Sequence, residues 1–147
     1  MIKKNSISLS EICLTIKKKR IFHNLSINFS ANGLTIILGP NGSGKTLLTK
    51  VILGLTETDN GEVKILNENN GSYGYAPQKI TFLRRNVFDN IAFPMIIKGF
   101  GKKTIFKRVN YIMKKFGIYN LKNMSARNLS GGLSQFVSFI RAIVNNP

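Results

Sequence analysis

Near the start of the chain, hydrophobic residues recur at about every second position, a period typical of strands with one buried face. A first run contains Ile7, Leu9, Ile12, Leu14 and Ile16. A second run contains Ile21, Phe22, Leu25, Ile27 and Phe29. The basic stretch 17–20 between them indicates a solvated turn, so the two runs predict a pair of antiparallel strands.

The next hydrophobic segment is continuous rather than alternating. Leu34-Thr35-Ile36-Ile37-Leu38 is almost wholly aliphatic, which predicts a fully buried strand. The apolar stretch 47–53 that follows is predicted to be a helix closed by Gly54. Further strands are predicted at 62–66 and, briefly, at 73–75, with a loop over 67–71 between them.

The second half of the chain has a helical period. Asn86 is placed to cap a short helix over 86–91, and the Gly99-Phe100-Gly101 breaker precedes an amphipathic helix. One face of that helix consists of Ile105, Val109, Ile112, Met113 and Phe116. Its lysines fall mostly on the other face, which we interpret as solvated: Lys102, Lys103, Lys107, Lys114 and Lys115. A last helix follows Gly132.

Composition adds one class of partner to consider. The 147 residues are 43% hydrophobic, enough for a globular domain with a core, and carry a net charge of +16. So basic a chain could bind nucleic acid or an anionic surface. The Lys and Arg residues are scattered rather than gathered in one tract, and a nucleotide-binding protein also needs positive potential, so nucleic acid is not favoured.

The single cysteine and the single histidine give no indication of a further functional site. Cys13 is the only cysteine, which excludes an internal disulfide, and its apolar surroundings predict a small buried residue. His23 has no neighbour that would form a dyad or a metal site, so we interpret it as structural or exposed. No apolar run approaches the length of a membrane span, and 1–5 lead into no signal-peptide core.

The candidate chemistry begins directly after the continuous apolar segment, in a glycine-rich loop. It reads Gly39-Pro40-Asn41-Gly42-Ser43-Gly44-Lys45-Thr46 and has the spacing G-x-x-x-x-G-K-[ST]. Its glycines let successive N–H groups point at an anion, and the following helix adds the positive end of its dipole. We therefore expect a phosphate-binding loop in which Lys45 reaches the β- and γ-phosphates and Thr46 offers its hydroxyl to Mg²⁺.

A second glycine cluster narrows the type of protein. Leu129-Ser130-Gly131-Gly132 directly precedes the last helix, which predicts another anion site by the same argument. Together with Ala76-Pro77-Gln78, these motifs stand in an order and at spacings that resemble the ATP-binding subunits of ABC transporters. The resemblance covers essentially the whole chain.

The resemblance implies a role for each motif. The segment 39–46 is the Walker A loop, and Gln78 is the Q-loop glutamine that contacts Mg²⁺ and the attacking water. Ser130, Gly131 and Gly132 are the signature loop, which in a head-to-tail dimer closes on ATP held by a second ATP-binding subunit. It further implies ATP and Mg²⁺ as ligands, Lys45 and Gln78 as catalytic residues, and a transmembrane permease that docks on the helical subdomain.

Some positions depart from the family pattern. Leu133 replaces the usual signature glutamine and Phe136 the usual arginine, whereas Gln135 matches. Ile16 stands where the family stacks an aromatic ring on adenine. The Walker B aspartate, the catalytic glutamate and the switch histidine are expected beyond Pro147, and the carboxylates of Asp59, Glu62 and Asp89 are not placed to replace them.

These observations predict an α/β fold: a P-loop NTPase core with N-terminal antiparallel strands and a helical subdomain, the C-terminal part of the family fold being absent. The expected divisions are a nucleotide-binding core (1–81), the helical subdomain (82–128) and the signature loop with its helix (129–147). The predicted function is ATP binding as the energy-coupling ATPase subunit of an ABC transporter, peripheral on the cytoplasmic face of the cell membrane. The resemblance implies an ATP hydrolase, but residues 1–147 alone are not expected to hydrolyse ATP. The alternatives are a non-hydrolysing nucleotide-binding remnant and a soluble ABC-type protein acting on nucleic acid.

Overall fold

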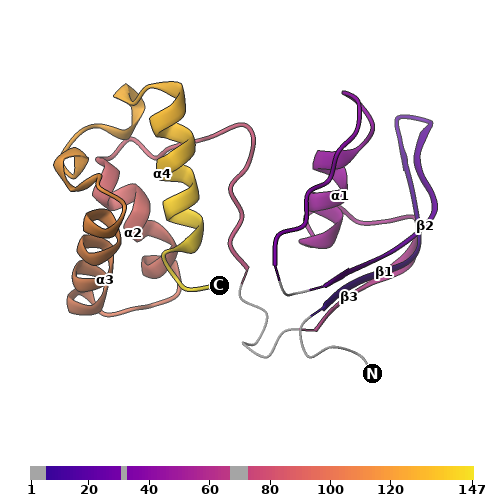
Figure 1. The fold of residues 1–147 in the computed structure, drawn as a ribbon, viewed down its shortest axis with the longest axis horizontal. Coiled ribbons are helices and arrows are strands. Elements are labelled where there is room, and N and C mark those ends of the chain that lie inside the picture. Colours follow the sequence, from indigo (N-terminus) through magenta and orange to yellow (C-terminus); the bar gives the residue numbers. More distant parts are fainter. Residues whose placement is uncertain (1–5, 31–32, 67–72) are drawn as a thin grey trace. The chain divides into compact units, whose positions relative to one another are not determined.

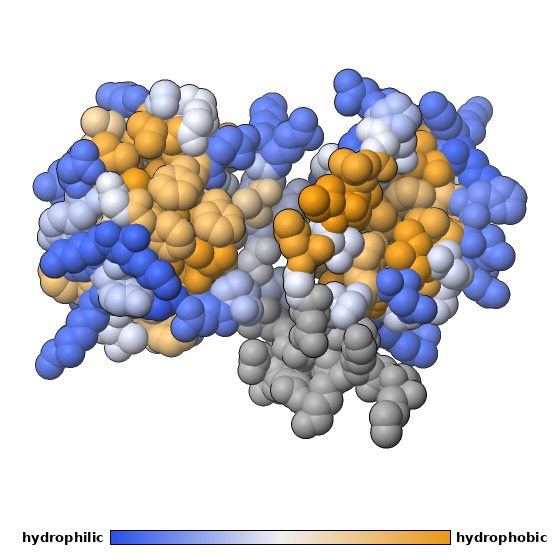
Figure 2. All heavy atoms as spheres, viewed as in Figure 1, coloured by the Kyte–Doolittle hydropathy of each residue, from blue (hydrophilic) through white to orange (hydrophobic). Residues whose placement is uncertain are grey.

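The computed structural model describes residues 6–30, 33–66 and 73–147, which form two compact units, Met1–Gly71 and Ser72–Pro147 (Figure 1). The predicted loop over 67–71 and the N-terminal residues 1–5 lie outside the described residues. Each unit has its own hydrophobic core, and hydrophobic side chains also reach the surface of both units (Figure 2).

The first unit is a small antiparallel sheet with one helix packed on it. Strands β1 (Ser6–Ile16) and β2 (Lys19–Ser30) form the predicted hairpin, and β3 (Asn60–Leu66) pairs antiparallel with the other edge of β1. Helix α1 (Lys45–Ile52) covers one face. The buried core residues are Leu9, Ile12, Leu14, Phe22, Leu48 and Val51.

The hairpin turn uses an unusual pair of residues. Lys17 and Lys18 both have positive φ, 50° and 64°, while Ile16 pairs with Lys19. A two-residue turn with both φ angles positive is of the type I′ kind, whose twist matches that of the flanking strands. The solvated turn predicted at 17–20 is therefore confirmed, although neither central residue is the Gly or Asn that favours this turn.

The second unit is a bundle of helices. It contains α2 (Val87–Ile97), α3 (Lys102–Lys115), the 3₁₀ turns η1 (Tyr119–Leu121) and η2 (Ala126–Asn128), and α4 (Gly131–Ile143). The predicted cap is confirmed, because Asn86 Oδ1 accepts a hydrogen bond of 2.7 Å from Asp89 N. The predicted apolar face of α3 is also confirmed: Ile105, Val109, Ile112 and Met113 are buried, and Phe116 packs against the same core.

One buried polar side chain organises the entry to this bundle. Asn90 is fully buried; its Oδ1 accepts from Leu83 N at 2.9 Å, and its Nδ2 donates to Asn86 O at 2.9 Å and Arg85 O at 3.2 Å. The side chain thus satisfies backbone groups of a segment that has no regular ladder of its own. Nothing in the hydrophobic pattern pointed to this role.

Four predictions from the hydrophobic pattern are wrong. Residues 34–38 and 73–75 belong to no strand among the described residues, because no described segment pairs with them. Leu34 and Leu38 are 87% and 86% exposed rather than buried. Cys13 is half-buried, with Sγ accepting from Asn24 N at 3.4 Å. Helix α2 continues past position 91 to Ile97, because Ala92 and Met95 pack in the core of the second unit.

Candidate functional site

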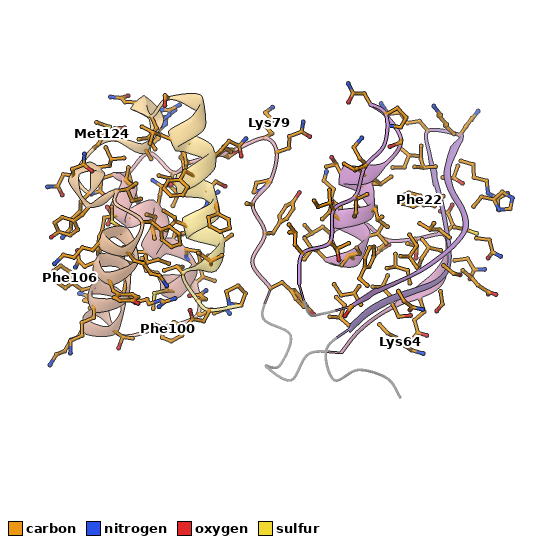
Figure 3. All side chains as sticks on the ribbon, viewed as in Figure 1. Phe22, Lys64, Lys79, Phe100, Phe106 and Met124 are labelled. Carbon is orange, nitrogen blue, oxygen red and sulfur yellow. The ribbon has the colours of Figure 1, made fainter. Side chains whose placement is uncertain are left out.

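The glycine-rich loop lies between the exposed segment 34–38 and α1. Gly42 and Gly44 both have positive φ, 81° and 92°, a conformation that residues with a Cβ rarely adopt. A Cβ on Gly44 would also lie 3.0 Å from the ring of Phe22 on β2, a residue labelled in Figure 3. Glycine at position 44 therefore lets the loop both turn sharply and approach the sheet closely, a constraint that sequence spacing did not reveal.

The N-terminal end of α1 is open to an anion. Its N-cap residue, Gly44, has no side chain to cap the helix, and the first turn contains no acidic residue. The first N–H groups of a helix have no acceptor within it, so those of α1 remain available to a ligand. By contrast, the side chain of Asn86 caps the N-terminal end of α2.

Lys45 brings a positive charge to the same place. Its Nζ donates hydrogen bonds to the carbonyl oxygens of Gly39 at 2.8 Å and Pro40 at 2.7 Å, so the side chain folds back over the loop. The side chain of Thr46 next to it is exposed. An ammonium, uncapped helix N–H groups and an exposed hydroxyl together fit the phosphates of a nucleotide with its Mg²⁺.

The other predicted site residues belong to the second unit. Ser130 is the N-cap of α4, where its Oγ accepts from Leu133 N at 3.5 Å. A Cβ built on Gly131 or Gly132 would meet no described atom within 4 Å. Packing among the described residues therefore does not require glycine at these two positions.

Two side chains of α4 hold the segment that contains Gln78. Gln135 Nε2 donates to Gln78 O at 3.4 Å, and a guanidinium nitrogen of Arg141 donates to Thr81 O at 3.0 Å. Arg141 also lies over the ring of Phe82, 5.2 Å from its centroid, and partial burial lowers the pKa of its guanidinium. The structure thus joins α4 to the backbone of the Gln78 segment, in which the side chains of residues 78 and 79 are exposed.

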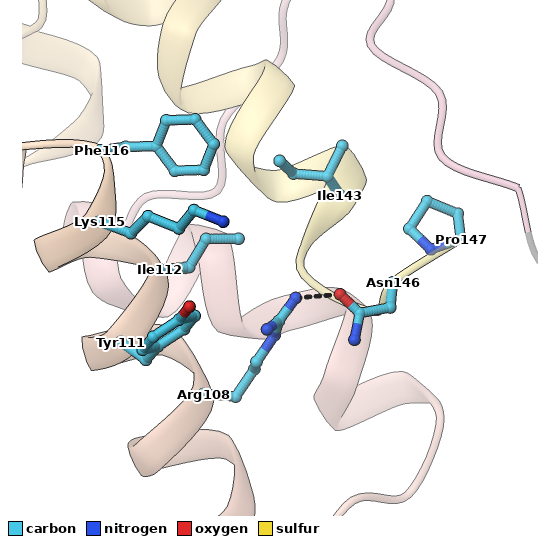
Figure 4. Close-up of a pocket in the computed structure, with 8 residues that line it drawn as sticks. All are labelled: Arg108, Tyr111, Ile112, Lys115, Phe116, Ile143, Asn146 and Pro147. Carbon is cyan, nitrogen blue, oxygen red and sulfur yellow. Dashed lines mark hydrogen bonds between the residues drawn. The ribbon is translucent and has the colours of Figure 1, made fainter. Parts of the chain in front are cut away.

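A cavity of about 350 Å³ in the second unit is lined by residues of α3, by Phe116 that follows it, and by residues at and after the C-terminal end of α4 (Figure 4). Its most basic residue, Arg108, donates from Nε to Val144 O at 2.8 Å and from its guanidinium to Asn146 Oδ1. A cation at this position satisfies carbonyl groups at the C-terminal end of α4 and complements the helix dipole. Among the described residues there is no cluster of His, Cys, Asp or Glu side chains suited to a metal ion.

Comparison with known proteins identifies the family. The sequence profile of the ABC transporter family matches residues 22–147. The chain belongs to the ABC transporter family. The predicted resemblance is therefore confirmed, and with it the α/β P-loop fold.

Relatives within the ABC family include named ATP-binding subunits. The chain is 31% identical over 144 residues to the zinc import ATP-binding protein ZnuC of Buchnera aphidicola, covering 96% of this chain and 57% of that protein. It is 34% identical over 155 residues to the molybdate/tungstate import ATP-binding protein WtpC of Methanocaldococcus jannaschii, covering 100% of this chain and 50% of that protein. The chain thus spans about half the length of these relatives.

Solved structures of ABC proteins share the fold. CbiO1 of Clostridium perfringens, part of the transporter complex cbiONQ, superposes with a TM-score of 0.79 at 21% identity, covering 96% of this chain and 62% of that one. A bacterial Atm1-family ABC exporter with ATP bound superposes with a TM-score of 0.82 at 20% identity, covering 100% of this chain and 28% of that one. Among the residues described for the present chain, no helix is both long and apolar enough to cross a bilayer.

Proposed function

We propose that the chain binds Mg²⁺-ATP through its Walker A loop, as the nucleotide-binding part of an ABC transporter's energy-coupling subunit. The open N-terminal end of α1, with Lys45 folded over the loop that precedes it, carries the proposal. Residues 39–46 would hold the phosphates, and Thr46 and Gln78 would hold Mg²⁺. The ion supplies charge neutralisation on the phosphates when bound.

The signature residues support a second part of the proposal. Ser130, Gly131 and Gly132 are exposed at the start of α4 and are not constrained by packing among described residues. A partner's nucleotide phosphates could approach that helix start closely. We therefore propose a head-to-tail dimer with a second ATP-binding subunit, and docking on a transmembrane permease at the cytoplasmic face of the membrane.

Hydrolysis is proposed at the level of the assembled enzyme rather than for these residues alone. Glu62 forms an ion pair with Lys64 on β3 at 2.8 Å, and Asp89 lies in the first turn of α2. Neither carboxylate follows a buried parallel strand beside the Walker A loop, where the family places its general base. Residues 1–147 are thus expected to bind ATP while contributing Lys45 and Gln78 to catalysis.

The proposal is tested by comparing nucleotides that differ in their phosphates. The loop and the α1 N–H groups contact phosphate, so we expect AMP to bind at least about tenfold more weakly than ATP, each lost charge-assisted contact being worth about 1.5–3 kcal/mol. Calorimetric titrations at fixed Mg²⁺ would measure this difference. Equal affinities for AMP and ATP would contradict binding through the phosphates.

A second prediction concerns the base. Ile16 ends β1 and is 39% exposed; it stands where the family stacks an aromatic ring. Apolar contact reads neither base edge, whereas a bidentate hydrogen-bonded contact discriminates by about 1–3 kcal/mol. We therefore expect ATP and GTP to compete within about tenfold of each other. Ile16→Tyr should raise the affinity for both nucleotides by stacking, and a strong preference of the unmodified chain for ATP would contradict the prediction.

A further inference from the structure

The connection between α2 and α3 places apolar side chains in solvent among lysines. It reads Ile96-Ile97-Lys98-Gly99-Phe100-Gly101-Lys102-Lys103, and we call it the 96–103 tip. Ile96, Ile97 and Phe100 are 47%, 69% and 43% exposed. Single exposed apolar residues are ordinary on protein surfaces, but three within five positions form a patch that merits an explanation. Phe100 is labelled at this connection in Figure 3.

The backbone holds the tip in a defined shape. Gly99 has a φ of 77°, Gly99 N donates to Ile96 O at 3.0 Å, and Phe100 N donates to Met95 O at 3.1 Å. This pair of bonds is the Schellman arrangement that ends many helices. Met95 and Ile105, on either side of the tip, are buried at 3% and 8% exposure. The exposed apolar side chains are therefore displayed by an ordered turn anchored in the core.

The charge around the tip has one sign. Lys98, Lys102 and Lys103 belong to the tip, and Lys107 follows one turn along α3. Asp89 is the single acidic residue between positions 73 and 147, in the first turn of α2 and hence at the other end of that helix from the tip. Lysines next to exposed apolar side chains are complementary to an anionic surface with a hydrophobic layer beneath it.

We propose that the 96–103 tip is a direct contact with anionic lipid: Ile96, Ile97 and Phe100 enter the interface between headgroups and acyl chains, and the lysines bind the headgroup phosphates. Nucleic acid fits the tip less well. Its binding surfaces gain affinity from aromatic stacking on bases, and two of the three exposed apolar residues are isoleucines, which have no ring to stack. The contact requires no nucleotide and goes beyond the permease-mediated attachment proposed above.

The absence of tryptophan from the sequence allows a direct test. Phe100→Trp, a change at an exposed position, gives the 147-residue chain a single tryptophan at the tip, which can be excited selectively at wavelengths that tyrosine does not absorb. Vesicles of phosphatidylcholine with phosphatidylglycerol should shift its emission to the blue, and brominated lipids should quench it. Leu55→Trp, at a position 61% exposed in the first unit, is the matched control and should respond to neither. A Phe100→Trp spectrum unchanged by these vesicles would overturn the proposal.

Sedimentation with vesicles measures how much the apolar and the basic side chains of the tip each contribute to lipid binding. Ile97→Ser with Phe100→Ser should lower the partitioning of the chain onto vesicles at least about tenfold. Lys102→Gln with Lys103→Gln should lower it by up to about fivefold for each lysine near the anionic surface. The control Lys17→Gln with Lys18→Gln removes the same charge from the β1–β2 turn and should have a smaller effect. Equal losses in both lysine pairs, or stronger binding to single-stranded RNA than to vesicles, would overturn the proposal that the tip lysines bind lipid headgroups. Lys45→Ala should leave partitioning unchanged, which separates this contact from nucleotide binding.

Discussion

Replacing Lys45 by Ala is expected to lower the affinity of the chain for ATP at least tenfold at fixed Mg²⁺. A charge-assisted hydrogen bond to phosphate contributes about 1.5–3 kcal/mol, and about 1.4 kcal/mol corresponds to a factor of ten. The ammonium of Lys45 already lies over the loop, bonded to Gly39 O and Pro40 O. It can transfer from these carbonyl oxygens to a phosphate without a large reorganisation of the backbone.

A lysine in the last turn of the same helix provides the control. Lys50 is exposed in the last turn of α1, so Lys50→Ala removes an equal charge from the unit without touching the loop. Calorimetry should show a large loss of affinity for Lys45→Ala and little change for Lys50→Ala, with circular dichroism confirming that both remain folded. Unchanged ATP affinity in Lys45→Ala would exclude the Walker A loop as the phosphate site.

Elements with a local signal could be predicted from the sequence. The alternation in β1 and β2, the apolar face of α3 and the cap at Asn86 each depend on neighbours a few positions apart, and all are present in the structure. Whether the segment 34–38 forms a buried strand depends instead on a pairing partner that a local pattern does not reveal. No described strand pairs with it, so its hydrophobicity alone gave the wrong expectation.

In the candidate site, too, local features could be predicted from the sequence and long-range contacts could not. The spacing of 39–46 specifies the loop, and glycine at positions 42 and 44 permits the positive φ angles found there. The hydrogen bonds from Gln135 to Gln78 and from Arg141 to Thr81 join residues 57 and 60 positions apart. Contacts at that separation depend on how α4 packs against the 78–82 segment, which no motif spacing encodes. Gln135 matches the family pattern, but the sequence does not identify its hydrogen-bond partner.

The exposed segment 34–38 leads to the last prediction: the purified 147-residue chain is expected to self-associate through it. Leu34, Ile36 and Leu38 are 87%, 68% and 86% exposed, and the segment belongs to no strand among the described residues. An unpaired apolar segment can pair with a copy of itself. Burying one leucine side chain in such a contact contributes about 1.5–3 kcal/mol.

A pair of charged substitutions should therefore disperse the chain. Leu34→Lys with Leu38→Lys removes two of the most exposed apolar side chains and adds repulsion between copies, so the concentration for half-association should rise at least about tenfold in sedimentation velocity. The control Leu55→Lys with Tyr111→Lys adds the same charge at positions 61% and 56% exposed in other elements. Equal dispersal by both pairs would mean that net charge, rather than the 34–38 segment, governs association. A monodisperse unmodified chain at high concentration would show that this segment is already covered within the chain.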